Sequence, residues 1–168
     1  MRCRPASCWW RTAAPGRPYT PRSTSGPTAS RAVYVDSGPL PDGEAVNAGL
    51  PGDDVEIPLP AWDVFEGKLD GIDEAGLARF RARAVPQPTG TARDPQQLSD
   101  ARRYDVPVTF ITSTGTEAEV REAAAQGMRT FAELPLLTDV TFLELPTGHW
   151  PMFSRPADLG AALVKAIG

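Results

Sequence analysis

The stretch VTFLELPTGHWPMFSRPADLGAALVKAI, residues 140–167, places an apolar run, a loop and an amphipathic segment in immediate succession. Five of residues 140–145 are apolar or β-branched, which is typical of a buried strand. Beyond the loop, Pro156 and Asp158 favour the first turn of a helix, and Lys165 favours its last turn. One apolar face is predicted for this helix, formed by Leu159, Ala162, Leu163, Ala166 and Ile167.

Two more strands are predicted upstream of this unit. Residues 32–35 and 106–112 are short apolar runs rich in β-branched side chains. A helix over 117–126, closed by Gly127, lies between the second and third strands. Alternation of buried strands with amphipathic helices indicates an α/β fold with a parallel sheet covered on both faces.

The segment between the first two strands reads as a long excursion over residues 40–104. Its first part, 40–60, is rich in proline, glycine and acidic residues and predicts irregular structure. Asp73 and Glu74 then begin a helix with Leu77, Phe80 and Ala84 on one face, which Pro86 and Pro88 end. Apolar side chains near this helix either line a substrate pocket or simply pack together: Leu59, Trp62, Phe65, Leu69 and Ile72.

Two polar residues follow strands at the edge where parallel sheets usually carry their sites. Asp36 comes directly after the first strand, beside Ser37, Gly38 and Pro39. His149 is the single histidine of the chain and follows the third strand, between Gly148 and Trp150. A glycine before it allows a tight turn, so the imidazole is expected at the working edge. An aspartate that only caps a turn is the alternative for Asp36.

The sequences LPTGHWPMFSRPADL (145–159) and VYVDSGPLPDG (33–43) resemble the catalytic-histidine loop and the sixth strand of the α/β-hydrolase family. The resemblance covers residues 32–168 and implies the C-terminal half of that fold, with 40–104 as its cap. It implies a triad of nucleophile, acid and histidine, in which His149 is the histidine. The acid is Asp36, placed as in some haloalkane dehalogenases, or Glu117 after the second strand; we favour Asp36.

Residues 1–31 differ sharply from the rest of the chain. Met1 to Ala32 contain six arginines but no Asp, Glu, Lys, Val, Ile, Leu or Phe, whereas the other 136 residues carry all 21 acids. This composition predicts an irregular or disordered arm. No GxSxG nucleophile motif occurs in the chain. The codons of residues 8–16, read in a shifted register, permit Leu-Val-Ala-His-Ser-Gly-Ala-Gly, which resembles a nucleophile elbow. We therefore interpret residues 1–31 as a frameshifted nucleophile region.

The resemblance implies a serine hydrolase of small esters or related acyl substrates, here without its nucleophile and inactive; a hydroxynitrile-lyase chemistry stays open. The other hypothesis is a noncatalytic binding module with a basic arm. The net charge of −4 gives no reason to expect nucleic acid as a partner. No membrane contact, cofactor or metal is expected, since Cys3, Cys8 and one histidine cannot form a four-ligand zinc site. A cytoplasmic location is expected.

Overall fold

The computed structural model describes residues 31–168. Its centre is a parallel sheet of three strands in the order β1-β4-β5. These strands are β1 (Ala32–Val35), β4 (Val108–Thr112) and β5 (Val140–Glu144). The three predicted strands and their parallel arrangement are therefore confirmed. The interpretation of residues 1–31, with both cysteines, concerns a segment that lies outside the described residues except for Arg31.

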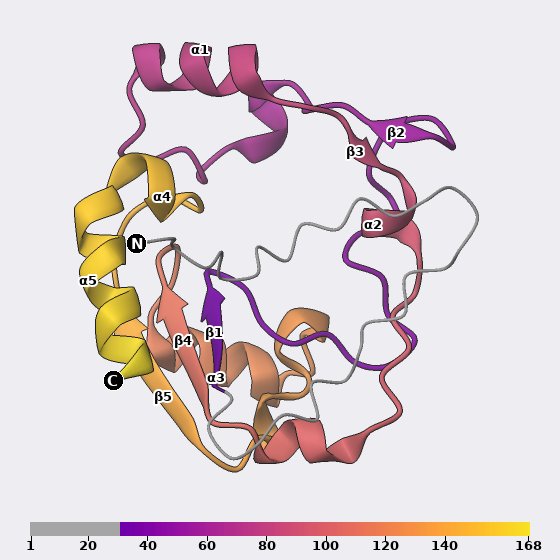
Figure 1. Ribbon diagram of the computed structural model, residues 1–168, viewed down its shortest axis with the longest axis vertical. Coiled ribbons are helices and arrows are strands. Elements are labelled where there is room, and N and C mark those ends of the chain that lie inside the picture. The colour runs from indigo at the N-terminus through magenta and orange to yellow at the C-terminus, as the bar shows by residue number, and fades with distance from the viewer. Residues whose placement is uncertain (1–30) are drawn as a thin grey trace, which may run out of the picture.

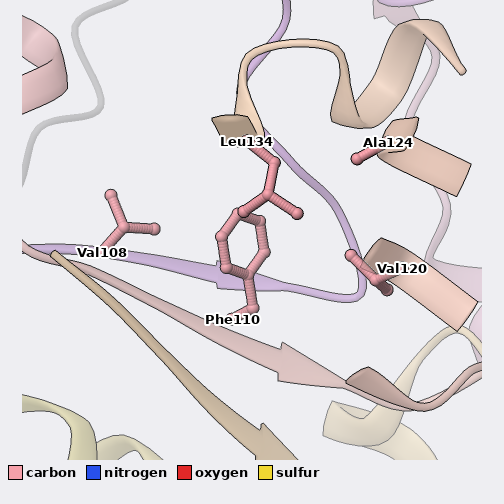
Figure 2. Close-up of a cluster of buried hydrophobic side chains, with 5 residues drawn as sticks. All are labelled: Val108, Phe110, Val120, Ala124 and Leu134. Atoms are coloured by element: carbon pink, nitrogen blue, oxygen red, sulfur yellow. The ribbon is translucent and has the colours of Figure 1, made fainter. Parts of the chain in front are cut away.

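Helices cover the two faces of this sheet. On one face, α3 (Glu117–Ala125) contributes Val120 and Ala124 to a buried cluster around Phe110 (Figure 2). On the other face, Leu159 of α5 (Pro156–Ile167) packs against Ile111. Because neighbouring residues of a strand point to opposite faces, Phe110 packs on the side of α3 and Ile111 on the side of α5. The α/β character predicted from the sequence is confirmed.

Aromatic rings lock the register of the strands. Tyr34, Phe110 and Phe142 occupy matching positions on the three strands. Their rings stack side by side, with centroids 5.6 Å apart for Tyr34 and Phe110 and 5.1 Å apart for Phe110 and Phe142. Slipping any strand by one residue would move its ring to the opposite face, so this ladder fixes which residues reach the carboxyl edge of the sheet.

The prediction for α5 is only partly right. Leu159 and Ala166 are buried and Ala162 is half-buried against the sheet, but Leu163 is 36% exposed and Ile167 is 66% exposed. The expected apolar face is thus wider than the surface that receives it. The apolar cluster that receives the helix includes Leu159 and Ala162 but does not extend to Leu163 or Ile167.

The segment between β1 and β4 arches over the carboxyl ends of the strands (Figure 1). It contains the predicted helix, α1 (Glu74–Arg83), which begins as expected at an Asp73 cap. It also contains short elements that the sequence did not predict, namely η1 (Trp62–Phe65), the antiparallel pair β2 (Glu56–Ile57) and β3 (Gln87–Pro88), α2 (Gly90–Arg93) and η2 (Ala101–Asp105). After β4 the remaining elements are η3 (Arg129–Phe131), η4 (Leu134–Leu136) and α4 (Pro151–Ser154).

Arginines hold this arch through its main-chain carbonyls. Arg93 donates to the carbonyl oxygens of Leu50, Gly52 and Asp53. Arg81 binds the carbonyls of residues 59 and 60, and Arg129 binds those of residues 45 and 46. The arch is therefore an ordered part of the molecule although regular secondary structure is sparse in it.

Candidate functional site

Asp36 stands at the carboxyl end of β1 in an uncommon backbone conformation. Its φ is 47°, and it is the one non-glycine residue with a positive φ in the part of the chain that the structure describes. Aspartate tolerates this left-handed region better than most residues because its short polar side chain can bond locally. The main chain nevertheless continues the ladder, since the Asp36 amide donates to the carbonyl of Ile111 at 2.8 Å. The turn thus begins abruptly after the last paired residue.

The Asp36 carboxylate is held by the loop that follows β4. Its Oδ1 accepts hydrogen bonds from the amides of Ser113 at 2.9 Å and Thr114 at 2.8 Å. The Thr114 hydroxyl lies 3.0 Å from both carboxylate oxygens. Only 6% of the side chain is exposed. These hydrogen bonds occupy most of the lone pairs of the carboxylate and leave one lone pair of Oδ2 available for a further donor.

His149 is the further donor to Oδ2. Its Nδ1 lies 2.6 Å from Asp36 Oδ2, a distance typical of a strong charge-assisted hydrogen bond. An ionised carboxylate can only accept, so the proton is on Nδ1 when the imidazole is neutral, and Nε2 then carries a free lone pair. Within residues 31–168 no hydrogen bond to Nε2 is formed, and 38% of the imidazole side chain is exposed. A basic nitrogen is therefore presented to the surface.

The loop that carries His149 is clamped from the other side by residues 68–70. The His149 amide donates to the carbonyl of Lys68 at 2.8 Å, and the Gly148 amide donates to the carbonyl of Asp70 at 3.1 Å. A Cβ on Gly148 would lie 2.5 Å from that Lys68 oxygen and 2.7 Å from the Asp70 amide nitrogen and carbonyl oxygen. Gly148 was expected to permit a turn; instead its φ is not positive, and it is required because two segments of main chain touch there.

Aromatic packing completes the support of this loop. Trp150, next to the histidine, meets the rings of Phe65 and Phe80 at centroid distances of 4.9 and 5.2 Å. Phe80 also contacts Trp62 and Phe153. Phe65 therefore packs against the histidine loop, and Trp62 packs against Phe65 and Phe80. A hollow of about 440 Å³ lies elsewhere, beside Tyr34 and Glu133, and none of the five apolar residues predicted to line a pocket contributes to it.

Glu117, the other acid considered, is placed in a different environment. Its carboxylate pairs with Arg121 one turn further along α3, at 2.7 Å. Its amide is capped by the side chain of Glu144, at 2.9 Å. The structure therefore brings Asp36 and not Glu117 into contact with His149.

The electrostatic setting of Asp36 keeps it ionised. Burial raises the pKa of this carboxyl, but the hydrogen bonds from His149, Thr114 and Ser113 outweigh burial and hold the pKa well below its ordinary value of 3.8. The carboxylate can therefore stabilise a positive charge on the imidazole at any pH above the strongly acidic range.

This shift predicts a specific loss of stability in acid. A carboxyl whose folded-state pKa is depressed stabilises the fold above its unfolded pKa, and the contribution disappears as the pH falls below that value. We expect the free energy of unfolding of the wild type to fall more steeply below pH 3.8 than that of Asp36→Asn. Denaturant unfolding over a series of pH values measures both slopes. The exposed acids Asp53, Asp100 and Glu119 also have lowered pKa values but are common to both proteins. A pH-independent difference would contradict the prediction.

The hydrogen bonds from Ser113 and Thr114 that hold Asp36, here called the cradle, were not predicted from the sequence, although a sequence pattern pointed to them. Ser113 and Thr114 belong to the run TSTGT, residues 112–116, which follows β4 directly. Since Val35 pairs with Ile111 in the parallel register, the run that follows β4 leaves the sheet next to Asp36. A hydroxyl-rich run after a strand adjacent to an acid was thus the available clue.

Two kinds of feature are absent from the described residues. No group of three His, Cys, Asp or Glu side chains in residues 31–168 is arranged to hold a metal ion. None of the helices in this range combines the length and apolarity needed to cross a membrane. Comparison of the chain with models of protein families, with curated proteins and with solved structures finds no match.

Proposed function

We propose that residues 32–168 are the acid-and-histidine half of an α/β-hydrolase that acts on small esters or related acyl substrates. The observation that carries the proposal is the contact of 2.6 Å between Asp36 Oδ2 and His149 Nδ1 at the carboxyl edge of a parallel sheet. A buried, ionised acid that orients a half-exposed imidazole is the arrangement that activates a hydroxyl nucleophile.

In this proposal His149 is the general base and acid. Its Nε2 takes the proton of an attacking serine hydroxyl and later gives it to the departing alcohol, so the imidazole is transiently a cation. Asp36 holds the imidazole in the tautomer with the proton on Nδ1 and offsets the positive charge that forms. The Lys68 carbonyl fixes the main chain of His149 at 2.8 Å and so sets the position from which Nε2 acts.

The nucleophile is the part that the chain does not supply in its present frame. We propose that it lies in the shifted reading of codons 8–16, as His-Ser-Gly-Ala-Gly. The chain as written is then expected to hydrolyse no p-nitrophenyl acetate, whereas the frame-restored, full-length protein hydrolyses it with an acyl-enzyme burst.

The experiment has two steps. Resequencing the DNA under codons 8–32 comes first, and an intact reading in the present frame with no nearby insertion or deletion would remove the basis for a restored nucleophile. The frame-restored protein is then assayed beside its His149→Ala variant and beside Gly160→Ala, an exposed helix position where a Cβ meets nothing within 4 Å. Activity that survives His149→Ala would overturn the proposed function.

A further inference from the structure

Thr114 makes more contacts to the Asp36 carboxylate than any other residue of the described chain. Its amide donates to Oδ1 at 2.8 Å, and its hydroxyl lies 3.0 Å from Oδ1 and 3.0 Å from Oδ2. Ser113 adds one amide, and its buried hydroxyl also contributes to the lowered pKa of Asp36. Thr114 is the residue whose hydroxyl lies within hydrogen-bond distance of both carboxylate oxygens.

We infer that Thr114 is a positioning residue for the acid: its hydroxyl orients the Asp36 carboxylate so that Oδ2 faces His149 Nδ1. The inference rests on the proposed function, because it assigns a role within the Asp36–His149 pair. Thr114 does not touch His149 and acts only through Asp36.

The geometry explains why a side chain is needed. The two amides from 113 and 114 both donate to Oδ1, so Oδ2 receives no main-chain donor from this loop. The Thr114 hydroxyl lies 3.0 Å from both oxygens, so it places a donor within reach of Oδ2, the oxygen that faces His149. His149 is the one titratable side chain of residues 31–168 that lies within hydrogen-bond distance of the carboxylate. No other charged group in this range can replace the hydroxyl.

The test measures proton binding by Asp36 in the chain as it exists. Thr114→Val keeps the shape and the amide but removes the hydroxyl, and Thr114 is exposed, so little packing is lost. Loss of a hydrogen bond to the ionised form is expected to tighten proton binding by about tenfold. The measurement is the pH at which the Asp36 carboxyl signal begins to shift as acid is added to the folded protein, followed by ¹³C NMR of labelled aspartate and identified by its absence from Asp36→Asn.

Three variants make the result decisive. Thr114→Ser keeps the hydroxyl and should titrate like the wild type. Thr114→Ala also removes the hydroxyl but adds no branched side chain, and it should behave like Thr114→Val. It therefore tests the hydroxyl even if valine disturbs the loop. Thr116→Val removes the hydroxyl that caps α3 in the same loop, but Thr116 makes no contact with Asp36. It should lower stability by about 1 kcal/mol and leave the Asp36 titration unchanged.

The inference is overturned if Asp36 titrates alike in Thr114→Val, Thr114→Ala and the wild type, or if Thr116→Val shifts it equally. Its failure can be told apart from failure of the proposed function. A frame-restored protein that hydrolyses esters while the Asp36 titration ignores Thr114 refutes this inference alone. An inactive frame-restored protein with the expected shift in Asp36 refutes the proposed function alone.

Discussion

Replacing Gly148 by alanine is expected to displace the histidine loop and to destabilise the protein by about 3 kcal/mol or more. The new methyl carbon would lie 2.5 Å from the Lys68 carbonyl oxygen and 2.7 Å from the Asp70 amide nitrogen and carbonyl oxygen. These are main-chain atoms that cannot rotate away, so the loop and residues 68–70 must separate. Separation breaks the hydrogen bonds from the Gly148 and His149 amides, which leaves buried polar groups unpaired.

The measurement is equilibrium unfolding in denaturant, together with the NMR signal of the His149 ring. Gly160→Ala is the matched control: Gly160 lies inside α5, and a Cβ there meets nothing within 4 Å. It should stabilise the protein by up to about 1 kcal/mol, since alanine favours a helix over glycine. If both substitutions changed stability by similar amounts, the close approach at Gly148 would be disproved.

Replacing Asp36 by asparagine is expected to invert the tautomer of His149. The amides of Ser113 and Thr114 donate to Oδ1, so the asparagine oxygen must occupy that position and its NH₂ group must face His149 Nδ1. The imidazole then accepts at Nδ1 and carries its proton on Nε2, the nitrogen required as a base. In the frame-restored enzyme kcat should fall by about 10⁴-fold.

The tautomer can be measured without any activity. His149 is the single histidine of the chain, so its ¹⁵N ring signals are unambiguous. Asparagine also tolerates the positive φ of position 36, so the turn is retained. Asp100→Asn serves as control because Asp100 is an ionised, exposed acid paired with Arg102 and not with His149. A wild-type proton found on Nε2, or an unchanged tautomer in Asp36→Asn, would contradict the assignment.

The regular elements of the α/β core follow from local sequence. Gly127 ends α3 with a φ of 74°, as its position after the helix predicted, and Pro156 begins α5. The contact between Asp36 and His149 also agrees with their predicted positions after strands. Local rules suffice here because burial of one face and the end of a helix each depend on a few neighbouring residues.

Contacts between distant segments of main chain could not be predicted in the same way. The carbonyls of Lys68 and Asp70 accept hydrogen bonds from His149 and Gly148, about 80 positions away in the sequence. The side chains of residues 68–70 give no indication of these main-chain contacts. The exposed Leu163 and Ile167 of α5 were missed for a related reason. How much of a helix face is covered depends on the residues of distant segments that pack against it, which periodicity in the helix does not reveal.

Because the arch is held through main-chain carbonyls, much of its amino-acid sequence can change without loss of these contacts. The guanidinium groups of Arg81, Arg93 and Arg129, and the amides of Gly148 and His149, all grip oxygen atoms that every amino acid possesses. The three arginines are constrained by these contacts, whereas most residues that supply the carbonyls contribute no side chain to them. Gly52 and Asp53 are exceptions, because a Cβ on Gly52 would lie 2.8 Å from the Glu56 carbonyl oxygen and the Asp53 carboxylate accepts from the Val55 and Glu56 amides. The surface above the histidine could thus be rewritten, by evolution or by an engineer, with its attachment points unchanged.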